Sequence, residues 1–166
     1  MIASPHIVVG SAMGLWSFNL FRGKNISIIV AFTVGIASHF VLDQIPHEEY
    51  VRGTLVLVCL MDVIIAITLS LRFGWTKLPA YSNYALIAGM IGGALPDVPF
   101  MFIRTFDLDW GWLYAAAEIN AYFHGPTTGV AKLSLSAQFL LALFSVLSVE
   151  MNRDINIKLT AHPHAG

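Results

Sequence analysis

Residues 26–47 read ISIIVAFTVGIASHFVLDQIPH, and this stretch decides the fold class. Positions 26–42 are apolar or small except for His39, and they reach the roughly 17 residues that the shortest bilayer-crossing helix needs. The whole chain of 166 residues is 57% hydrophobic and 11% charged, whereas soluble domains carry about 25% charged residues. With a net charge of -1, it also has no basic field to attract nucleic acid. The composition therefore predicts a small integral membrane protein.

Five apolar blocks predict an all-α, polytopic membrane protein with about five transmembrane helices. The blocks are 7–21, 26–42, 54–71, 84–103 and 134–149. Residues 1–152 then form a single transmembrane helical domain, and residues 153–166 form a polar C-terminal tail. No basic segment precedes the first block, so we interpret it as a retained helix and not as a signal peptide.

Lysine and arginine are distributed unequally between the loops, with six on one side of the predicted membrane and three on the other. Because basic loops stay in the cytoplasm, the N-terminus, the 43–53 loop and the 104–133 segment are predicted to face outward. Trp110, Trp112 and two tyrosines give residues 107–124 the composition of a helix that lies along the outer interface.

Glycines in two of the predicted helices indicate where helices approach each other closely. They are Gly10 and Gly14 in the first block and Gly89, Gly92 and Gly93 in the fourth. Small residues at such positions let helix backbones come together inside a membrane. We therefore interpret these glycines as packing residues.

Most acids and histidines fall on the outer side of this topology, where basic residues are few. The group comprises His6, His39, Asp43, His47, Asp62, Asp97 and His124, together with the loop acids Glu48 and Glu49, which we expect to be solvated. Buried carboxylates are costly in a membrane unless a positive charge neutralises them. Carboxylate and imidazole are the usual ligands of zinc, so the pattern predicts a divalent metal, zinc, at this side.

The spacing within this group suggests a role for each member. His39 and Asp43 are four residues apart and share one helix face, and Pro46 ends that helix so that His47 can turn back toward them. The first-choice ligands are His6, His39, Asp43 and Asp97. His47 and His124 would complete a second ion or protonate a leaving group. Asp62 would be a ligand or an acceptor that orients one imidazole.

Three short motifs resemble those of bacterial inner-membrane-associated, metal-dependent hydrolases. Residues 92–97 (GGALPD) resemble the family's Gly-x-x-Leu-Pro-Asp element, and His6 with Gly10 is similar to its His-x-x-x-Gly. Residues 124–129 (HGPTTG) resemble its His-Arg-Gly-x-Thr-His-Ser segment, with Gly125 in place of the arginine and Thr128 in place of the second histidine. The resemblance implies a metal-dependent hydrolase of the bacterial inner membrane, and the distribution of basic residues described above places its site toward the outer face.

A second resemblance covers residues 39–47, HFVLDQIPH, which look like the His-x-x-x-Asp…Pro-x-His helix of zinc-dependent phospholipases C. It implies that metal-activated water hydrolyses a phosphoester, and the membrane setting favours a lipid-linked substrate. The alternative is a non-enzymatic carrier of metal ions or protons. A carrier needs polar groups along its whole path, whereas the blocks at 7–21 and 134–149 contain no ionisable residue.

Overall fold

The computed structural model describes four continuous segments of the chain, residues 3–21, 24–45, 80–106 and 110–123. It also describes positions 61–62, 64–65, 68, 72, 134, 137–138, 140–141, 143–144, 146–147 and 150–151. The helices are α1 (Ala3–Phe21), α2 (Lys24–Asp43), α4 (Ala80–Ala94), α5 (Val98–Phe106) and α6 (Gly111–Phe123), with the 3-10 turn η1 (Leu95–Asp97) between α4 and α5. In this part of the chain there is no strand, and the predicted all-α class is confirmed.

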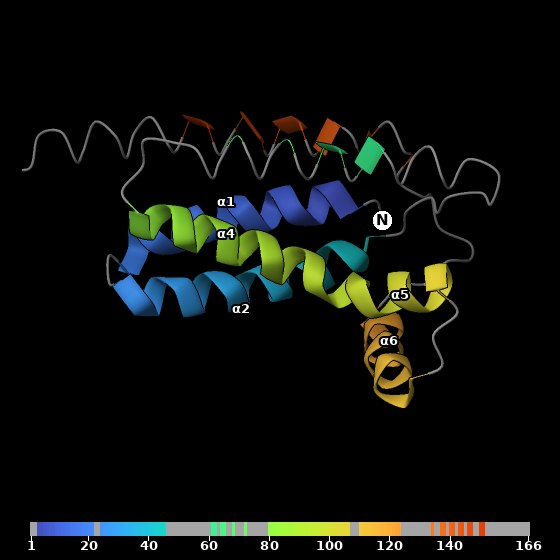
Figure 1. Cartoon of the computed structure of the whole chain (residues 1–166). Helices are drawn as coiled ribbons and strands as arrows, with labels where there is room; N and C mark the ends of the chain where they lie inside the picture. Colours follow the sequence, from blue (N-terminus) through green and yellow to red (C-terminus); the bar gives the residue numbers. More distant parts are fainter. Residues whose placement is uncertain are drawn as a thin grey trace, which may run out of the picture.

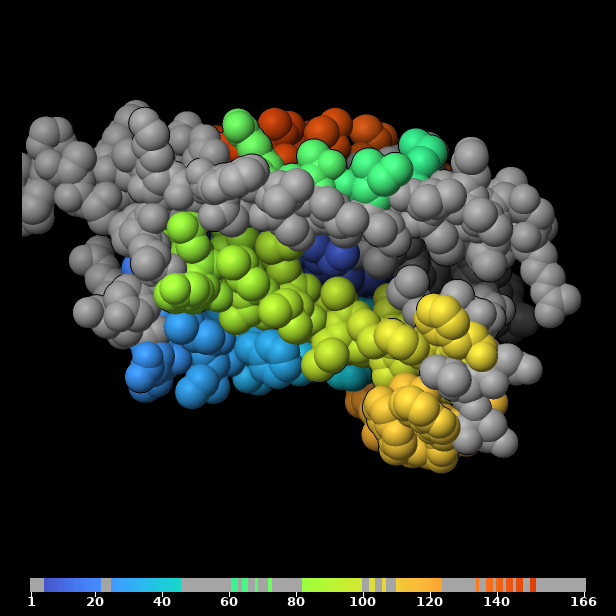
Figure 2. Space-filling model, in the orientation of Figure 1, coloured from blue at the N-terminus to red at the C-terminus, as the bar shows by residue number. Residues whose placement is uncertain are grey.

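Helices α1, α2 and α4 pack against one another, and α1 runs in the direction opposite to the other two (Figure 1). This arrangement brings the start of α1 and the ends of α2 and α4 to the same end of the bundle. Helices α5 and α6 lie at that end, where α6 projects away from the three packed helices (Figures 1 and 2). The topology therefore gathers residues from distant parts of the sequence at one end.

Glycine makes the close approach of these helices possible. A Cβ at Gly89 would collide with the carbonyl oxygen of Gly10, and one at Gly93 would collide with that of His6. Gly35 of α2 likewise approaches the carbonyl of Gly89. Backbone thus lies against backbone at these contacts, as the sequence predicted for the glycines of α1 and α4.

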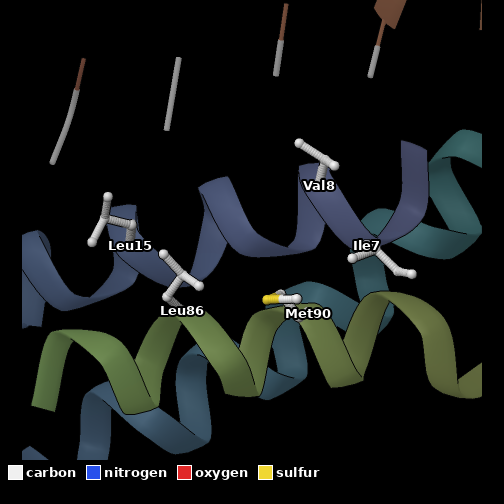
Figure 3. Packing of buried hydrophobic residues seen from close by; sticks show 5 residues of the cluster. All are labelled: Ile7, Val8, Leu15, Leu86 and Met90. Atoms are coloured by element: carbon white, nitrogen blue, oxygen red, sulfur yellow. The ribbon is translucent and has the colours of Figure 1, made fainter. Parts of the chain in front are cut away.

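An apolar core fills the space along the α1–α4 contact. It consists of Ile7, Val8 and Leu15 of α1 with Leu86 and Met90 of α4, and Figure 3 shows the two α4 side chains lying toward α1. The buried hydroxyls of Ser11 and Ser17 donate to carbonyl oxygens four residues earlier in their own helix. The α1–α4 contact is therefore apolar apart from these two serines, while Asp62 and Gln138 are further buried polar side chains among the described residues.

The structure divides the block at 84–103, which the sequence analysis treated as one helix. The helix starts earlier, at Ala80, and α4 ends at Ala94, after which η1 and α5 follow in a new direction (Figure 1). Pro96 has no N–H to donate to the carbonyl of Gly92, so the α-helical ladder cannot continue. The bend leaves Asp97 at the end of the bundle and not within a straight span.

Five spans were predicted, and within the described residues one segment, Asn25–Asp43 of α2, is long and apolar enough to cross a membrane. Most of the block at 54–71 and part of the block at 134–149 lie outside the described residues. The positions described between 61 and 72 and between 137 and 151 are helical. Arg72 Nε lies 3.3 Å from Glu150 Oε1. This ion pair joins two residues that the predicted topology placed on the same side.

Replacement of Gly89 by alanine should destabilise the bundle, because the new methyl group meets backbone that cannot move without separating α1 from α4. We expect the free energy of unfolding to fall by about 1–3 kcal/mol, although alanine favours a helix over glycine by about 1 kcal/mol. Denaturant unfolding in detergent, followed by circular dichroism, measures the change.

The matched control is Gly111→Ala on α6, where an added Cβ has no neighbour within 4 Å. Its stability should be unchanged or slightly raised. Equal stability of the two variants would contradict the close backbone contact.

Candidate metal centre

The end of the bundle gathers four side chains that the sequence analysis named as first-choice ligands. His6 lies one turn into α1, and Pro5 beside it is tolerated because the first turn of a helix needs no N–H donors. His39 and Asp43 form the last turn of α2, which ends shortly before Pro46 in the sequence. Asp97 ends η1. Helices α1 and α2 and the turn η1 thus each contribute polar side chains to one end of the bundle.

Asp43 lies between the two imidazoles. Its Oδ1 is 3.3 Å from His6 Nε2, and its Oδ2 is 3.0 Å from His39 Nε2. The two rings are tilted against each other with their centroids 4.1 Å apart. His6 and His39 are fully buried and Asp43 is 1% exposed. A carboxylate buried this deeply requires compensation by positive charge.

The tautomer of His39 follows from its contact with the backbone. Its Nδ1 lies 2.8 Å from the carbonyl oxygen of Gly93, which can only accept a hydrogen bond, so Nδ1 carries a proton. The remaining nitrogen, Nε2, faces three oxygens, namely Asp43 Oδ2 at 3.0 Å, Asn120 Oδ1 at 3.2 Å and Asp97 Oδ1 at 3.6 Å. A lone pair at Nε2 would be repelled by all three. The site is therefore complementary to a cation at this position, either a metal ion or a proton.

His6 has a ring nitrogen that is available to a ligand. Its Nδ1 is buried and has no hydrogen-bond partner among the described residues. Few buried polar atoms in native proteins are left in this state. The nearby Asp43 engages only the Nε2 side of the ring, so His6 is not saturated by the contacts that the structure describes.

The donor set fits a transition-metal ion such as zinc. His6, His39 and Asp43 each offer one ligand atom, and these atoms lie within 4.8 Å of one another. Two imidazoles and a carboxylate resemble the three-ligand sets of catalytic zinc, which leave one position open. The bond from Nδ1 of His39 to the Gly93 carbonyl is also typical of metal-ligating histidines, whose other nitrogen is held by an acceptor.

Asn120 of α6 completes the cluster, and the sequence analysis did not find it. Its Nδ2 donates to Asp97 Oδ1 at 3.1 Å while its Oδ1 faces His39. The side chain is 4% exposed. A signal was present in the sequence, because Leu113, Ala116 and Asn120 recur at helical spacing and place one amide on the buried face of α6.

Of the other predicted site residues, the structure describes one, Asp62. Asp62 is buried at 6% exposure but lies outside the set formed by His6, His39 and Asp43. His47, His124 and the two loop acids Glu48 and Glu49 lie outside the described residues, so the roles suggested for them stay predictions. The four first-choice ligands do converge, while their binding of an ion also stays a prediction.

Comparison with known protein families, curated proteins and solved structures finds no match for this chain. The motif resemblances therefore remain untested, and the functional interpretation depends on the geometry of the cluster.

The cluster should be visible in the metal content of the protein. Purified protein should contain a near-stoichiometric divalent ion by elemental analysis, and the double variant His39→Ala plus Asp43→Ala should lose it because two of three clustered ligands are gone. A concentration of zinc about 100-fold above Kd should raise the free energy of unfolding of the ion-free protein by about 2.7 kcal/mol.

The control is Ser38→Ala, since this buried neighbour of His39 donates only to the carbonyl of Gly35 in its own helix. It should retain the ion. Wild-type metal content in the double variant would remove α2 from any metal site.

A change at Asn120 should alter the affinity for the ion. Replacement by alanine removes the amide that lies between His39 and Asp97, so we expect metal affinity to fall about 10- to 100-fold without loss of binding at saturation. Competition with a chromophoric chelator measures Kd. Glu118→Ala, an exposed change on the same helix, should leave affinity unaltered, and an identical Kd in both variants would exclude Asn120 from the centre.

Proposed function

We propose that the chain is a membrane-embedded, metal-dependent hydrolase that acts on a phosphoester of a lipid or lipid-linked substrate. The observation that carries the proposal is the buried group of His6, His39 and Asp43, in which His39 Nε2 points at oxygens and thus favours a cation. The motif resemblance to inner-membrane-associated, metal-dependent hydrolases supports the same activity and remains part of the proposal.

Within this proposal the residues have distinct tasks. His6, His39 and Asp43 hold the ion, which we take to be zinc, and the Gly93 carbonyl fixes the orientation of His39. When bound, such an ion polarises a phosphoryl oxygen and makes water nucleophilic near neutral pH. Asp97 is the member of the cluster that solvent reaches, with 21% of its side chain exposed. Substrate and water therefore approach from the side of Asp97, where its carboxylate can accept a proton.

The membrane setting is also a proposal, and two features support it. A core helix of a soluble protein is mostly buried, whereas 33% of the apolar segment Asn25–Asp43 is buried. Large apolar side chains are exposed along the outer faces of α1, α2 and α4, among them Trp16, Ile29, Val41 and Ile91. Exposed large apolar side chains on three neighbouring helices are compatible with a lipid environment. The distribution of basic residues supports an orientation with the cluster toward the outer face, and the motif resemblance supports a bacterial inner membrane.

The alternative function, a carrier of metal ions or protons, is less consistent with the described interior. A carrier passes its ion through the bundle, and its path needs polar groups on both sides of the site. Below the cluster lies the apolar core of Val8, Leu15, Leu86 and Met90. The hydroxyls of Ser11 and Ser17 are already engaged by their own helix. A polar centre at one end of this apolar contact supports a site that opens to one face. Asp62 and Gln138 are buried polar side chains outside it that a carrier would have to use.

The proposed activity can be measured directly. Zinc-loaded protein should hydrolyse members of a panel of chromogenic phosphodiesters and phosphomonoesters, and a chelator should abolish turnover until zinc is restored. Asp97→Asn should lower kcat by at least about 100-fold if its carboxylate accepts a proton during the reaction.

Ser38→Ala serves again as the matched control and should retain full activity. Chelator-resistant turnover would contradict a metal-dependent mechanism. Zinc-loaded protein that cleaves none of the esters but admits zinc into sealed vesicles would replace the hydrolase with the carrier.

A further inference from the structure

An apolar pocket lies next to the metal centre, between η1, α5 and α6. Its volume is about 410 Å³, within the range of about 300–1,000 Å³ of pockets that bind small molecules. The wall includes Phe40, Pro96, Phe102, Leu113, Ala116 and Asn120. Among the described residues that line it, Asn120 is the one amide and none is charged, while Trp110 and Trp112 each contribute an indole N–H.

The pocket and the metal centre share a wall. Asn120 lines the pocket and at the same time contacts His39 and Asp97. Phe40 and Pro96 of the wall are the chain neighbours of the same two residues. The polar end of the pocket is therefore at Asn120, next to the cluster. Most of the other described lining residues are apolar.

We propose that this pocket binds a hydrocarbon chain of the substrate, so that the substrate is a single-chain or multi-chain lipid whose phosphoester lies at Asn120 and the metal centre. The inference rests on the proposed function, to which it adds the site that holds the hydrocarbon chain of the lipid substrate. A wall with one amide can satisfy one polar group at its end, and methylene groups elsewhere need no partner.

The same argument excludes a peptide as the occupant. A peptide would bring a backbone N–H and C=O with every residue, and each would lose its hydrogen bonds with water against an apolar wall. A hydrocarbon chain brings no such groups, and its burial is favourable in proportion to the area removed from water. The chemistry of the lining therefore selects a lipid tail.

Two tryptophans place the entrance of the pocket. Trp110 and Trp112 belong to the lining and are 53% and 64% exposed. Half-exposed tryptophan rings prefer the headgroup level of a bilayer. Figure 2 shows that α6, which carries Trp112, forms a separate lobe at this end of the molecule. In a membrane the entrance would face the level at which lipid esters lie.

The tryptophans also provide the experiment. In full-length protein held in amphipol, with Trp16 and Trp75 changed to phenylalanine, all tryptophan emission comes from Trp110 and Trp112. The probe is a long-chain alkyl phosphate that carries bromine on its chain, because bromine quenches tryptophan on contact. We expect saturable, one-to-one quenching. This readout needs no hydrolysis, so a failure of the proposed activity and a failure of chain binding are separate results.

Ala116→Phe should fill the pocket and weaken binding of the probe at least tenfold. Its matched control is Ala121→Phe, an exposed position on the same helix that is not part of the lining, and it should bind like the parent. Quenching that is linear in probe concentration and equal in both variants would overturn the proposal.

A series of chain lengths tests the parent protein alone, and so does not depend on the folding of any pocket variant. Affinity should rise about fourfold for each added methylene and then level off when the pocket is full. A rise that continues through the whole series reports partition into amphipol and would overturn the proposal.

Discussion

The hydrogen bond from His39 Nδ1 to the carbonyl of Gly93 connects the packing of the helices to the chemistry of the site. Glycines along α4 let the backbones of its neighbours come so close that a main-chain carbonyl, and not a side chain, reaches the imidazole. That acceptor fixes which nitrogen of His39 carries the proton. The other nitrogen is then left among oxygens from Asp43, Asn120 and Asp97. Because of this contact, His39 Nε2 favours a proton or a metal ion beside it.

The antiparallel course of α1 explains why the cluster forms at all. Polar residues near the beginning of α1 and near the ends of α2 and α4 would be scattered along three parallel helices, but here they meet at one end (Figure 1). The rest of the contact between α1 and α4 is free for apolar packing. The cluster of His6, His39 and Asp43 thus lies at one end of the bundle, and the apolar α1–α4 core lies along its length. Because of this separation, a membrane interior could surround the core while the cluster lies near the surface.

The sequence predicted those parts of the site that depend on local spacing or on the order of helices. His39 and Asp43 share a face because they are four residues apart, and alternating helix direction brings His6 and Asp97 to them. Helical spacing could have placed Asn120 on the buried face of α6, but its contact with His39 depends on how α6 folds back on α2, which no local pattern determines. The break at Pro96 was missed because the block at 84–103 was treated as one helix, and a proline does not specify the direction of the helix that follows. The burial of Asp62 outside the cluster likewise depends on tertiary packing.

Helix α6 reaches α2 through a small contact beside the cluster. Gln44 donates to the carbonyl of Phe123, the Phe40 and Phe123 rings lie 4.4 Å apart, and Asn120 meets His39. An interaction that holds Asn120 against His39 therefore also restrains the position of α6 relative to α2. If an ion bound at the cluster orders α6 through Asn120, a ligand that also orders α6 would raise the affinity for the ion by the factor by which the ion raises the affinity for that ligand. Occupation of the two sites would then be cooperative.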